Sequence, residues 1–298
     1  RDRKMVQPYV DCLCKEVAEI RSQAERAGLT LCSIYIGGGT PTSLSAAQLR
    51  QLMGTVRENF DLSKVVEYTV EAGRPDCTDA EKLAVIKEYG ATRISINPQT
   101  FSDEVLANIG RKHSAQDILD CYADARRAGH EDINMDLIAG LPGDTPARFA
   151  ASLEQALELG PSNITVHTLA LKKGAALFES RGGLPSDRDV AQMLVDAAQM
   201  LRSAGYKPYY LYRQKYMSGN FENVGWCRHH DIGLYNIYMM EEMHTILSLG
   251  GGGMNKVNLP GGKLERFHNP KYPAQYIERL DTVLAQKEDI FRLLAQQA

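Results

Sequence analysis

The chain has 298 residues, of which 44% are hydrophobic and 24% charged, and its formal net charge is −3. This composition is typical of a globular protein with a buried core. It excludes disordered and collagen-like classes, and the slightly acidic balance provides no general basic surface for nucleic acid. No apolar run approaches the about 18 residues of a membrane-spanning helix and no signal peptide opens the chain, so we expect a cytoplasmic protein.

Strand-like and helix-like segments alternate along the first two thirds of the chain. Apolar runs bounded by turn residues predict strands over 31–36, 65–71, 92–97, 133–138 and 163–169. Apolar residues at helical spacing, with capping and stop signals, predict helices over 8–27, 45–59, 79–89, 103–109, 115–128, 145–159 and 186–204. Because each strand is followed by at least one helix, the order predicts an α/β fold with a parallel sheet buried between helices.

A parallel sheet of this kind forms either a (β/α) barrel or a doubly wound sheet, and polar residues at or just past the strand ends distinguish between the two. They are Gly37 to Thr40, Glu71, Asn97 to Gln99, Asp136 and His167. A ring of such residues across every strand fits the mouth of a (β/α) barrel better than the single crevice of a doubly wound sheet. We therefore expect a parallel barrel, closed or open, over residues 1–205.

A different pattern begins near Gly205, so we expect a smaller C-terminal α+β region over residues 206–298. It opens with an aromatic, strand-like run over 206–215. A loop over 219–233, a helix around 238–249, the glycine run 250–253 and a helical stretch from residue 273 onward follow.

Three glycines stand directly after the first predicted strand, in the segment Tyr35-Ile-Gly-Gly-Gly-Thr-Pro-Thr42. Glycine lets a ligand approach the main chain closely, where N–H and C=O groups can bind an ammonium or a carboxylate. An ordinary tight turn is the alternative. The segment is neither a P-loop nor a dinucleotide fingerprint, because no Gly-Lys-Ser/Thr follows and the third glycine of G-x-G-x-x-G is missing.

Four polar side chains could contact a small molecule at the strand ends. Glu71, Gln99 and Arg111 could bind an ammonium, a sugar or base edge, and a carboxylate, respectively, with solvated surface or turn geometry as the alternative for each. Asp136 lies within the otherwise apolar run 133–138, where a carboxylate needs a partner. A functional role is therefore favoured for Asp136.

These motifs, in this order, resemble the radical S-adenosylmethionine (SAM) enzymes of the oxygen-independent coproporphyrinogen III oxidase group. The matching motifs are Tyr35–Thr42, Glu71-Ala-Gly-Arg-Pro75, Arg93-Ile-Ser-Ile-Asn-Pro-Gln99, Ile109-Gly-Arg-Lys-His113 and Asn134-Met-Asp-Leu-Ile-Ala-Gly-Leu-Pro142. Segments 219–225, 234–237, 240–242 and 249–253 resemble the C-terminal part of the coproporphyrinogen dehydrogenase branch called HemZ. The resemblance implies a partial parallel (β/α) barrel of the radical SAM type.

The resemblance also implies SAM and a [4Fe-4S] cluster as cofactors. The residues implied to bind SAM are Gly37, Gly38, Gly39, Thr40, Glu71, Gln99, Arg111, Asp136 and Ala170. In this set the glycine backbone would bind the methionine end, Arg111 its carboxylate, and Ala170 would lie beside the adenine. Glu71, Gln99 and Asp136 would bind the amino group and the ribose hydroxyls, and the resemblance leaves open which residue binds which group.

The implied activity is an oxidative decarboxylation in heme biosynthesis. A deoxyadenosyl radical abstracts hydrogen from a propionate of the tetrapyrrole coproporphyrinogen III, which loses carbon dioxide and becomes vinyl. The electron donor, the electron acceptor and any catalytic residue stay unspecified. Propionate recognition favours cations near the mouth, for which exposed surface charge is the alternative role. The candidates are Arg213, Lys215, Lys256 and Arg266.

Two other functions stay open. A heme chaperone on the same scaffold shares the glycine and aspartate motifs, although residues 219–253 fit the dehydrogenase branch better. The other is a protein without a cluster that binds a small molecule or a partner and performs no turnover.

The family holds its cluster with three cysteines spaced C-x₃-C-x₂-C, and no such triplet is present here. The scattered cysteines, typical of reduced thiols, are Cys12, Cys14, Cys32, Cys77, Cys121 and Cys227. Because the chain begins with Arg1 and not Met, we expect the cluster-binding segment and the first barrel strand to lie upstream, which leaves strand 31–36 at a sheet edge. Natural loss of the cluster is the alternative. We expect no metal site at Cys227-Arg-His-His230, because adjacent imidazoles point in different directions.

Overall fold

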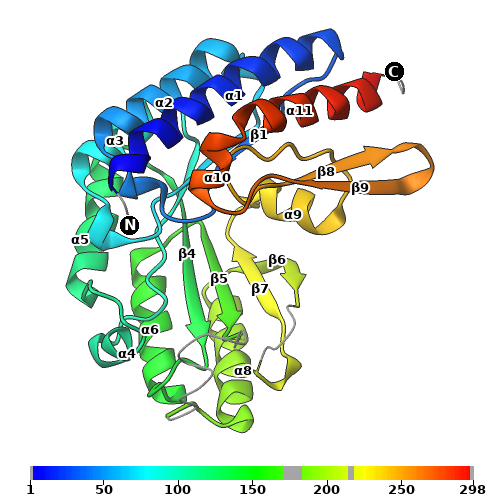
Figure 1. Cartoon of the computed structure of the whole chain (residues 1–298). Helices are drawn as coiled ribbons and strands as arrows, with labels where there is room; N and C mark the ends of the chain where they lie inside the picture. Colours follow the sequence, from blue (N-terminus) through cyan, green and yellow to red (C-terminus); the bar gives the residue numbers. More distant parts are fainter. Residues whose placement is uncertain (1–2, 171–182, 214–217, 296–298) are drawn as a thin grey trace.

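The computed structural model describes residues 3–170, 183–213 and 218–295. In these residues seven strands form one curled sheet in the order β1-β2-β3-β4-β5-β7-β6 (Figure 1). The parallel strands are β1 (Ser33–Ile36), β2 (Glu67–Glu71), β3 (Arg93–Ser95), β4 (Asp132–Ala139) and β5 (Asn163–Thr168). The antiparallel strands β7 (Asn223–Cys227) and β6 (Lys207–Tyr212) extend the sheet beyond β5.

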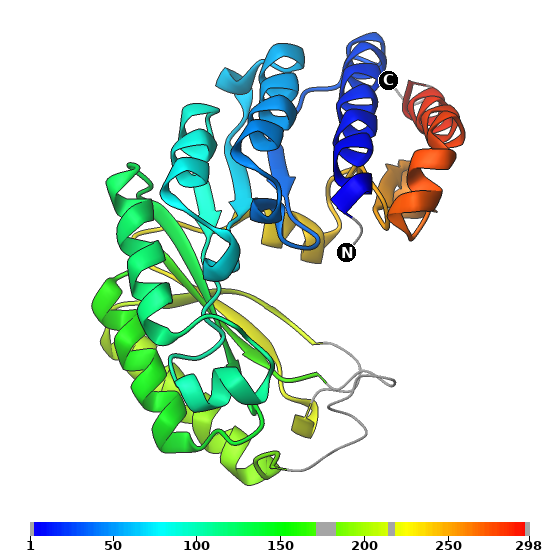
Figure 2. The ribbon, with the colours of Figure 1, turned by 60° about the vertical axis from the view of Figure 1, so that its left-hand side comes forward.

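Helices cover the outer side of this sheet, where Figure 2 shows them as an arc from blue to green. They are α2 (Ala46–Asn59), α3 (Ala80–Glu88), α4 (Asp103–Asn108), α5 (Ala115–Arg127), α6 (Pro146–Leu159) and α8 (Asp187–Ser203). Short 3₁₀ turns lie at Arg3–Met5, Pro41–Ser43, Leu62–Lys64, Pro75–Cys77, Ser218–Asn220 and Pro260–Gly262. Local sequence fixes the helix starts, since Ser45, Ser114 and Ser186 each form a capping box with the third helical residue.

The two faces of the sheet differ in polarity. Outward residues such as Val70, Ile94 and Met135 are fully buried against the helices. Residues of the opposite face, such as Thr69 and Asn134, are polar and line a cavity. The sheet does not close into a full barrel, since its end strands β1 and β6 do not pair with each other among the described residues. The predicted partial parallel barrel is confirmed, in its open form.

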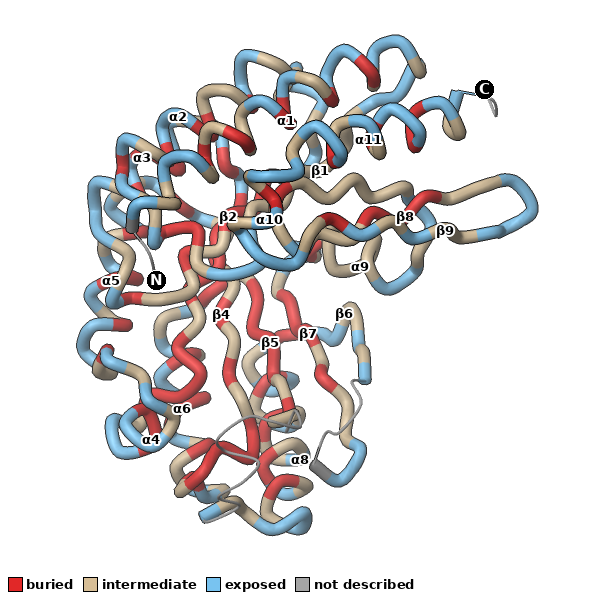
Figure 3. Tube along the Cα trace, viewed as in Figure 1, coloured by how far each residue is buried: buried red, intermediate tan, exposed pale blue. Residues whose placement is uncertain are grey.

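Residues beyond 205 contribute both to this sheet and to a separate layer. The segment predicted as a loop over 219–233 contains β7, so that prediction was wrong; the strand forms because β5 and β6 both pair with it. Of the helix predicted around 238–249, only residues 238–241 are helical, and the prediction was wrong for the rest. They belong to α9 (Leu234–Glu241), which ends before the left-handed Glu242. The hairpin of β8 (Met254–Leu259) and β9 (Lys263–His268), with its exposed tip, was not predicted (Figure 3).

The first and last helices pack together on one side of the sheet (Figure 1). They are α1 (Val6–Arg26), α10 (Pro273–Glu278) and α11 (Leu280–Ala295). Between α1 and α11 the buried ammonium of Lys287 lies 3.5 Å from the buried carboxylate of Glu16. The same carboxylate accepts hydrogen bonds from the Gly250 N–H and the Tyr276 hydroxyl, so it ties the glycine run to both helices.

Strand β1 is the terminal strand of the sheet, with β2 as its neighbour, as predicted for the segment 31–36. In the part of the chain that the structure describes, no helix has the length and apolar character needed to cross a membrane.

Candidate functional site

A cavity of about 330 Å³ opens on the inner face of the sheet. Its walls come from successive strands and from α9. The lining residues are Tyr35, Glu67, Thr69, Glu71, Arg93, Ser95, Asn134, Asp136, Thr165, His167, Tyr210, Tyr212, Gly233, Tyr235, Asn236, Met239 and Met240. Residues two apart on a strand share a face, which explains why Glu67, Thr69 and Glu71 all point inward.

Glu71 is held on the cavity wall by the end of the preceding strand. The Tyr35 hydroxyl donates a hydrogen bond to its Oε1 atom, and the Gly38 N–H also donates to the carboxylate. Burial raises the pKa of Glu71, with a further contribution from the charge of Asp136, while these two hydrogen bonds oppose the rise. The Tyr35 ring stacks on Tyr235 of α9, with centroids 3.9 Å apart. The carboxylate thus faces the cavity in one fixed orientation.

Asp136 lies within strand β4 and faces the same cavity. Its Oδ1 accepts a hydrogen bond of 2.8 Å from Asn134, and its Oδ2 lies 3.6 Å from Nε2 of His167. Burial alone would raise the pKa of Asp136, but His167, Asn134 and Thr165 together hold it below its usual range. Asp136 therefore presents a negative charge to the cavity at neutral pH.

The glycine segment after β1 passes directly beside Glu71. A Cβ atom at Gly37 would lie against the Tyr35 ring and 2.8 Å from Cδ of Glu71, so only glycine leaves this carboxylate in place. Behind the segment the buried Thr42 is fixed through its carbonyl, which accepts a hydrogen bond of 2.9 Å from Lys82.

Replacing Gly37 with alanine is expected to lower the free energy of unfolding by about 1–3 kcal/mol, because Tyr35 or Glu71 must shift to admit the methyl group. Gly39→Ala is the matched control, since a Cβ at Gly39 meets no atom within 4 Å and is expected to change the value by less than about 0.5 kcal/mol. Urea unfolding of both variants measures the difference. Equal stabilities would contradict the close approach at Gly37.

A second polar group lies at Arg74, Asp76, Arg111 and His113. Arg74 holds Asp76 through two hydrogen bonds, of 3.1 and 2.7 Å. The half-buried Arg111 guanidinium makes no hydrogen bond or ion pair among the described residues, and burial and the neighbouring Arg74 lower its pKa. Burial, and next the charge of Arg111, lower the pKa of the buried His113. Arg111 is therefore available to an anion.

Gln99 and Ala170 lie outside the cavity lining. Gln99 has a left-handed backbone with φ of 69°, and its main chain bridges to Asp136 and Ile138 of β4. Its side-chain amide donates to the carbonyl of Asn97, at 3.2 Å. Ala170 is half-buried just beyond β5. The structure thus brings Glu71, Asp136 and the start of the glycine segment together, and leaves the roles of Gln99, Arg111 and Ala170 as predictions.

The cations predicted to meet a substrate have carboxylate partners where they are described. Arg213 lies 3.0 Å from Glu222, and Lys256 and Arg266 lie 2.9 and 2.8 Å from Glu242. Lys256 also donates to the Met239 carbonyl near the end of α9, which gives it a structural role. Lys215 lies outside the described residues, and substrate binding by all four cations stays a prediction.

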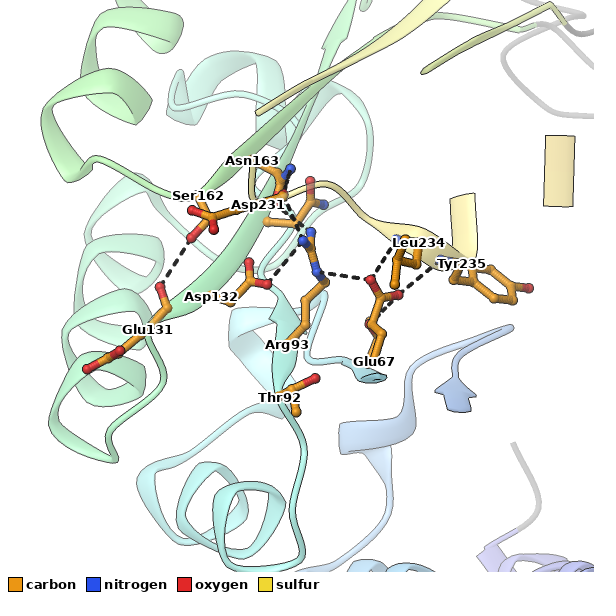
Figure 4. A network of polar contacts seen from close by, with 12 residues as sticks. Glu67, Thr92, Arg93, Glu131, Asp132, Ser162, Asn163, Asp231, Leu234 and Tyr235 are labelled. Carbon is orange, nitrogen blue, oxygen red and sulfur yellow. Dashed lines mark hydrogen bonds and ion pairs between the residues drawn. The ribbon is translucent and has the colours of Figure 1, made fainter. Parts of the chain in front are cut away.

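The sequence did not reveal the polar network that closes the other end of the cavity (Figure 4). Arg93 donates to Oδ1 of Asn163 at 2.5 Å and to the Asp231 carbonyl at 2.9 Å, and it lies 3.0 Å from Asp132. Glu67, 3.7 Å from Arg93, accepts hydrogen bonds from the first two N–H groups of α9, at 2.7 and 3.1 Å. A carboxylate at a helix N-terminus is stabilising. The available signal was Arg93 itself, since a cation inside a predicted strand requires partners.

The two implied cofactors fit this chain differently. An acidic cavity beside a glycine main chain, together with the free guanidinium of Arg111, fits the ammonium, hydroxyl and carboxylate groups of SAM. For the cluster, all six cysteines are free thiols, of which only Cys12 and Cys14 share an element, helix α1, and no three metal-binding side chains group together in the described residues. The residues described here do not fit an iron–sulfur cluster.

Comparisons with known proteins identify the family of this chain. Residues 15–156 match the Radical SAM superfamily. Over 290 residues and 95% of its length, the chain is 39% identical to the oxygen-independent coproporphyrinogen-III oxidase-like protein HemZ of Bacillus subtilis, of which it covers 58%. It is 32% identical over 266 residues to the heme chaperone HemW of the same organism, covering 85% of this chain and 66% of that protein.

Among solved structures, coproporphyrinogen III oxidase (HemN) from Escherichia coli matches 95% of this chain and 64% of that chain, with a TM-score of 0.72. At 23% identity this match shows the shared fold. The chain therefore spans 58% of the HemZ relative and 64% of the HemN chain. Residues 15–156 belong to the radical SAM superfamily, in a chain that is similar over 95% of its length to HemZ and over 85% of its length to the heme chaperone HemW.

Proposed function

We propose that the inner face of the curled sheet binds SAM. Glu71 and Asp136 would bind its ammonium and ribose hydroxyls, the main chain of Gly37 to Gly39 with Thr40 its methionine end, and Arg111 its carboxylate. The single observation that supports this most is the pairing of two fixed, cavity-facing carboxylates with an adjacent glycine main chain. When bound, SAM supplies a sulfonium group, while the protein positions it and excludes water.

Calorimetric titration of the chain with SAM tests this proposal. Saturable binding is expected for the wild type. Asp136→Asn, Glu71→Gln and Arg111→Met are each expected to bind SAM at least about tenfold more weakly than the wild type, since each loses a hydrogen bond to a charged group. Arg50→Gln is the control, because Arg50 pairs with Glu81 on the exposed surface. Absence of wild-type binding, or equal affinity in all variants, would refute the proposal.

For the whole protein we propose oxidative decarboxylation of the propionates of a coproporphyrinogen, supported by the 39% identity to HemZ. That reaction requires an iron–sulfur cluster, for which the cysteines of this chain offer no site, so the proposal for the chain itself is limited to cofactor and tetrapyrrole binding. The similarity to HemW favours heme binding without turnover as the second candidate.

Anaerobic titrations with coproporphyrinogen III and with heme separate these two candidates. The decarboxylase proposal predicts saturable binding of coproporphyrinogen, in competition with the vinyl-bearing porphyrinogen that the reaction produces. Stable heme retention through gel filtration, with no binding of coproporphyrinogen, would instead favour the chaperone.

A further inference from the structure

His167 extends from β5 into the cavity between two polar side chains on different strands. On one side its Nε2 lies 3.6 Å from Oδ2 of Asp136, which is long for a hydrogen bond but within ion-pair range. On the other side its Nδ1 lies 3.3 Å from the Tyr212 hydroxyl of β6. An imidazole with its proton on Nε2 satisfies both partners, accepting from Tyr212 and facing the carboxylate with a donor.

The other carboxylate oxygen of Asp136, Oδ1, is also fixed by a neighbouring side chain. The Asn134 amide donates to Oδ1 at 2.8 Å and to Ser95 at 3.1 Å, and its own oxygen accepts from Thr165 at 3.2 Å. The Asp136 carboxylate is thus held from both sides, yet its side chain keeps 21% of its surface exposed toward the cavity. Each oxygen retains a lone pair for a ligand donor.

We propose that His167 is a positioning residue that acts through Asp136, fixing this carboxylate toward the bound ligand while Tyr212 fixes the imidazole. The inference rests on the proposed function in one respect, namely that SAM is the ligand that binds to the Asp136 carboxylate. His167 itself is 23% exposed on the cavity wall, so packing alone does not require an imidazole there. Such supporting contacts reduce the freedom of a binding group and so raise the affinity for its ligand.

A double-mutant cycle measured by SAM titration tests the proposal. His167→Phe is expected to weaken SAM binding about five- to tenfold in the wild-type background, but less than about twofold when Asp136 is already asparagine. His167→Gln, which keeps a donor for Asp136, is expected to restore most of the affinity. Equal fold-changes in the two backgrounds, or no effect in the wild type, would overturn the proposal.

A ligand-free measurement separates this inference from the proposed function. Carbon-13 NMR of the Asp136 carboxyl group is expected to show a higher pKa in His167→Phe than in the wild type, with an intermediate value in His167→Gln. Tyr35, Glu71 and Tyr210 also interact electrostatically with Asp136. These residues are the same in the wild type and in both His167 variants, so a difference in the pKa of Asp136 reports the change at His167 alone. An unchanged pKa of Asp136 overturns the positioning role whether or not SAM binds. A shifted pKa without SAM binding overturns only the proposed function.

Discussion

Replacing Arg93 with methionine is expected to lower the free energy of unfolding by about 3–5 kcal/mol, one of the two largest effects that the structure implies. Arg93 is 4% exposed, and its guanidinium is the common partner of Asp132, Asn163 and the Asp231 carbonyl. Without it, the buried amide oxygen of Asn163 and the half-buried carboxylate of Asp132 lose their donor. The loss comes from the desolvation free energy of groups left without a partner, which is larger than the net stabilisation that the hydrogen bonds themselves provide.

Urea unfolding at pH 7 measures this loss, and Arg50→Met is the matched control because its ion pair with Glu81 is exposed. We expect the control to change the free energy of unfolding by less than about 1 kcal/mol. Comparable losses in the two variants would contradict the role assigned to the buried network.

The effect of Arg93→Met depends on pH with a defined sign. Burial raises the pKa of Asp132 from 3.8 to about 6, although Arg93 opposes the rise. A carboxyl with a raised pKa in the folded state stabilises the protein below its unfolded pKa, and this contribution is lost as the pH rises through the folded pKa. Removing Arg93 raises that pKa further. The difference between variant and wild type is therefore expected to shrink as the pH falls from the variant's higher folded pKa of Asp132 to about 6, and to stay constant below that pH.

Replacing Lys287 with methionine is expected to cost a similar amount, about 3–5 kcal/mol, at a site remote from the cavity lining. The side chains of Lys287 and Glu16 are both 0% exposed, and the ammonium also donates to the Ser248 carbonyl at 2.6 Å and to Asn255 at 2.5 Å. The variant leaves the Glu16 carboxylate buried without its counter-charge. Burial already lowers the pKa of Lys287 to about 8, against the attraction of Glu16.

A double variant distinguishes a lost charge from lost packing. Glu16→Gln combined with Lys287→Met removes both charges, while the glutamine oxygen can still accept from Tyr276 and Gly250. We expect the double variant to be more stable than Lys287→Met alone, as measured by thermal and urea unfolding. If the losses of unfolding free energy in Lys287→Met and in Glu16→Gln alone simply add in the double variant, the broken ion pair is not the cause of the destabilisation.

Several elements could be placed from the sequence because their signals are local. The predicted strand 133–138 is β4 (Asp132–Ala139), and the predicted helix 145–159 is α6 (Pro146–Leu159) with Thr145 as its cap. Periodicity and capping act within a few residues, so a single segment carries the information. The same holds for Asp136, whose position in an apolar strand requires a functional or structural partner.

Other features depended on neighbours far apart in the chain. Strand β7 is short and contains Gly225, which leaves room for the Tyr210 ring of the adjacent strand. Nothing local marks such a segment as a strand, because its pairing with β5 and β6 stabilises it. The partners of Arg93 likewise come from β4, β5 and the loop after β7, which only the curled sheet brings together.

The sequence by itself determined the alternation of strands and helices, the glycine segment after β1, and the acidic side chains Glu71 and Asp136 that line the cavity, because those depend on local periodicity and residue chemistry. Only the tertiary structure decided that the barrel is open, that α9 is fixed by Glu67 across the cavity, and that His167 supports Asp136. The physical reason is that burial and charge pairing arise between segments distant in sequence, so their free energies exist only once the chain has folded.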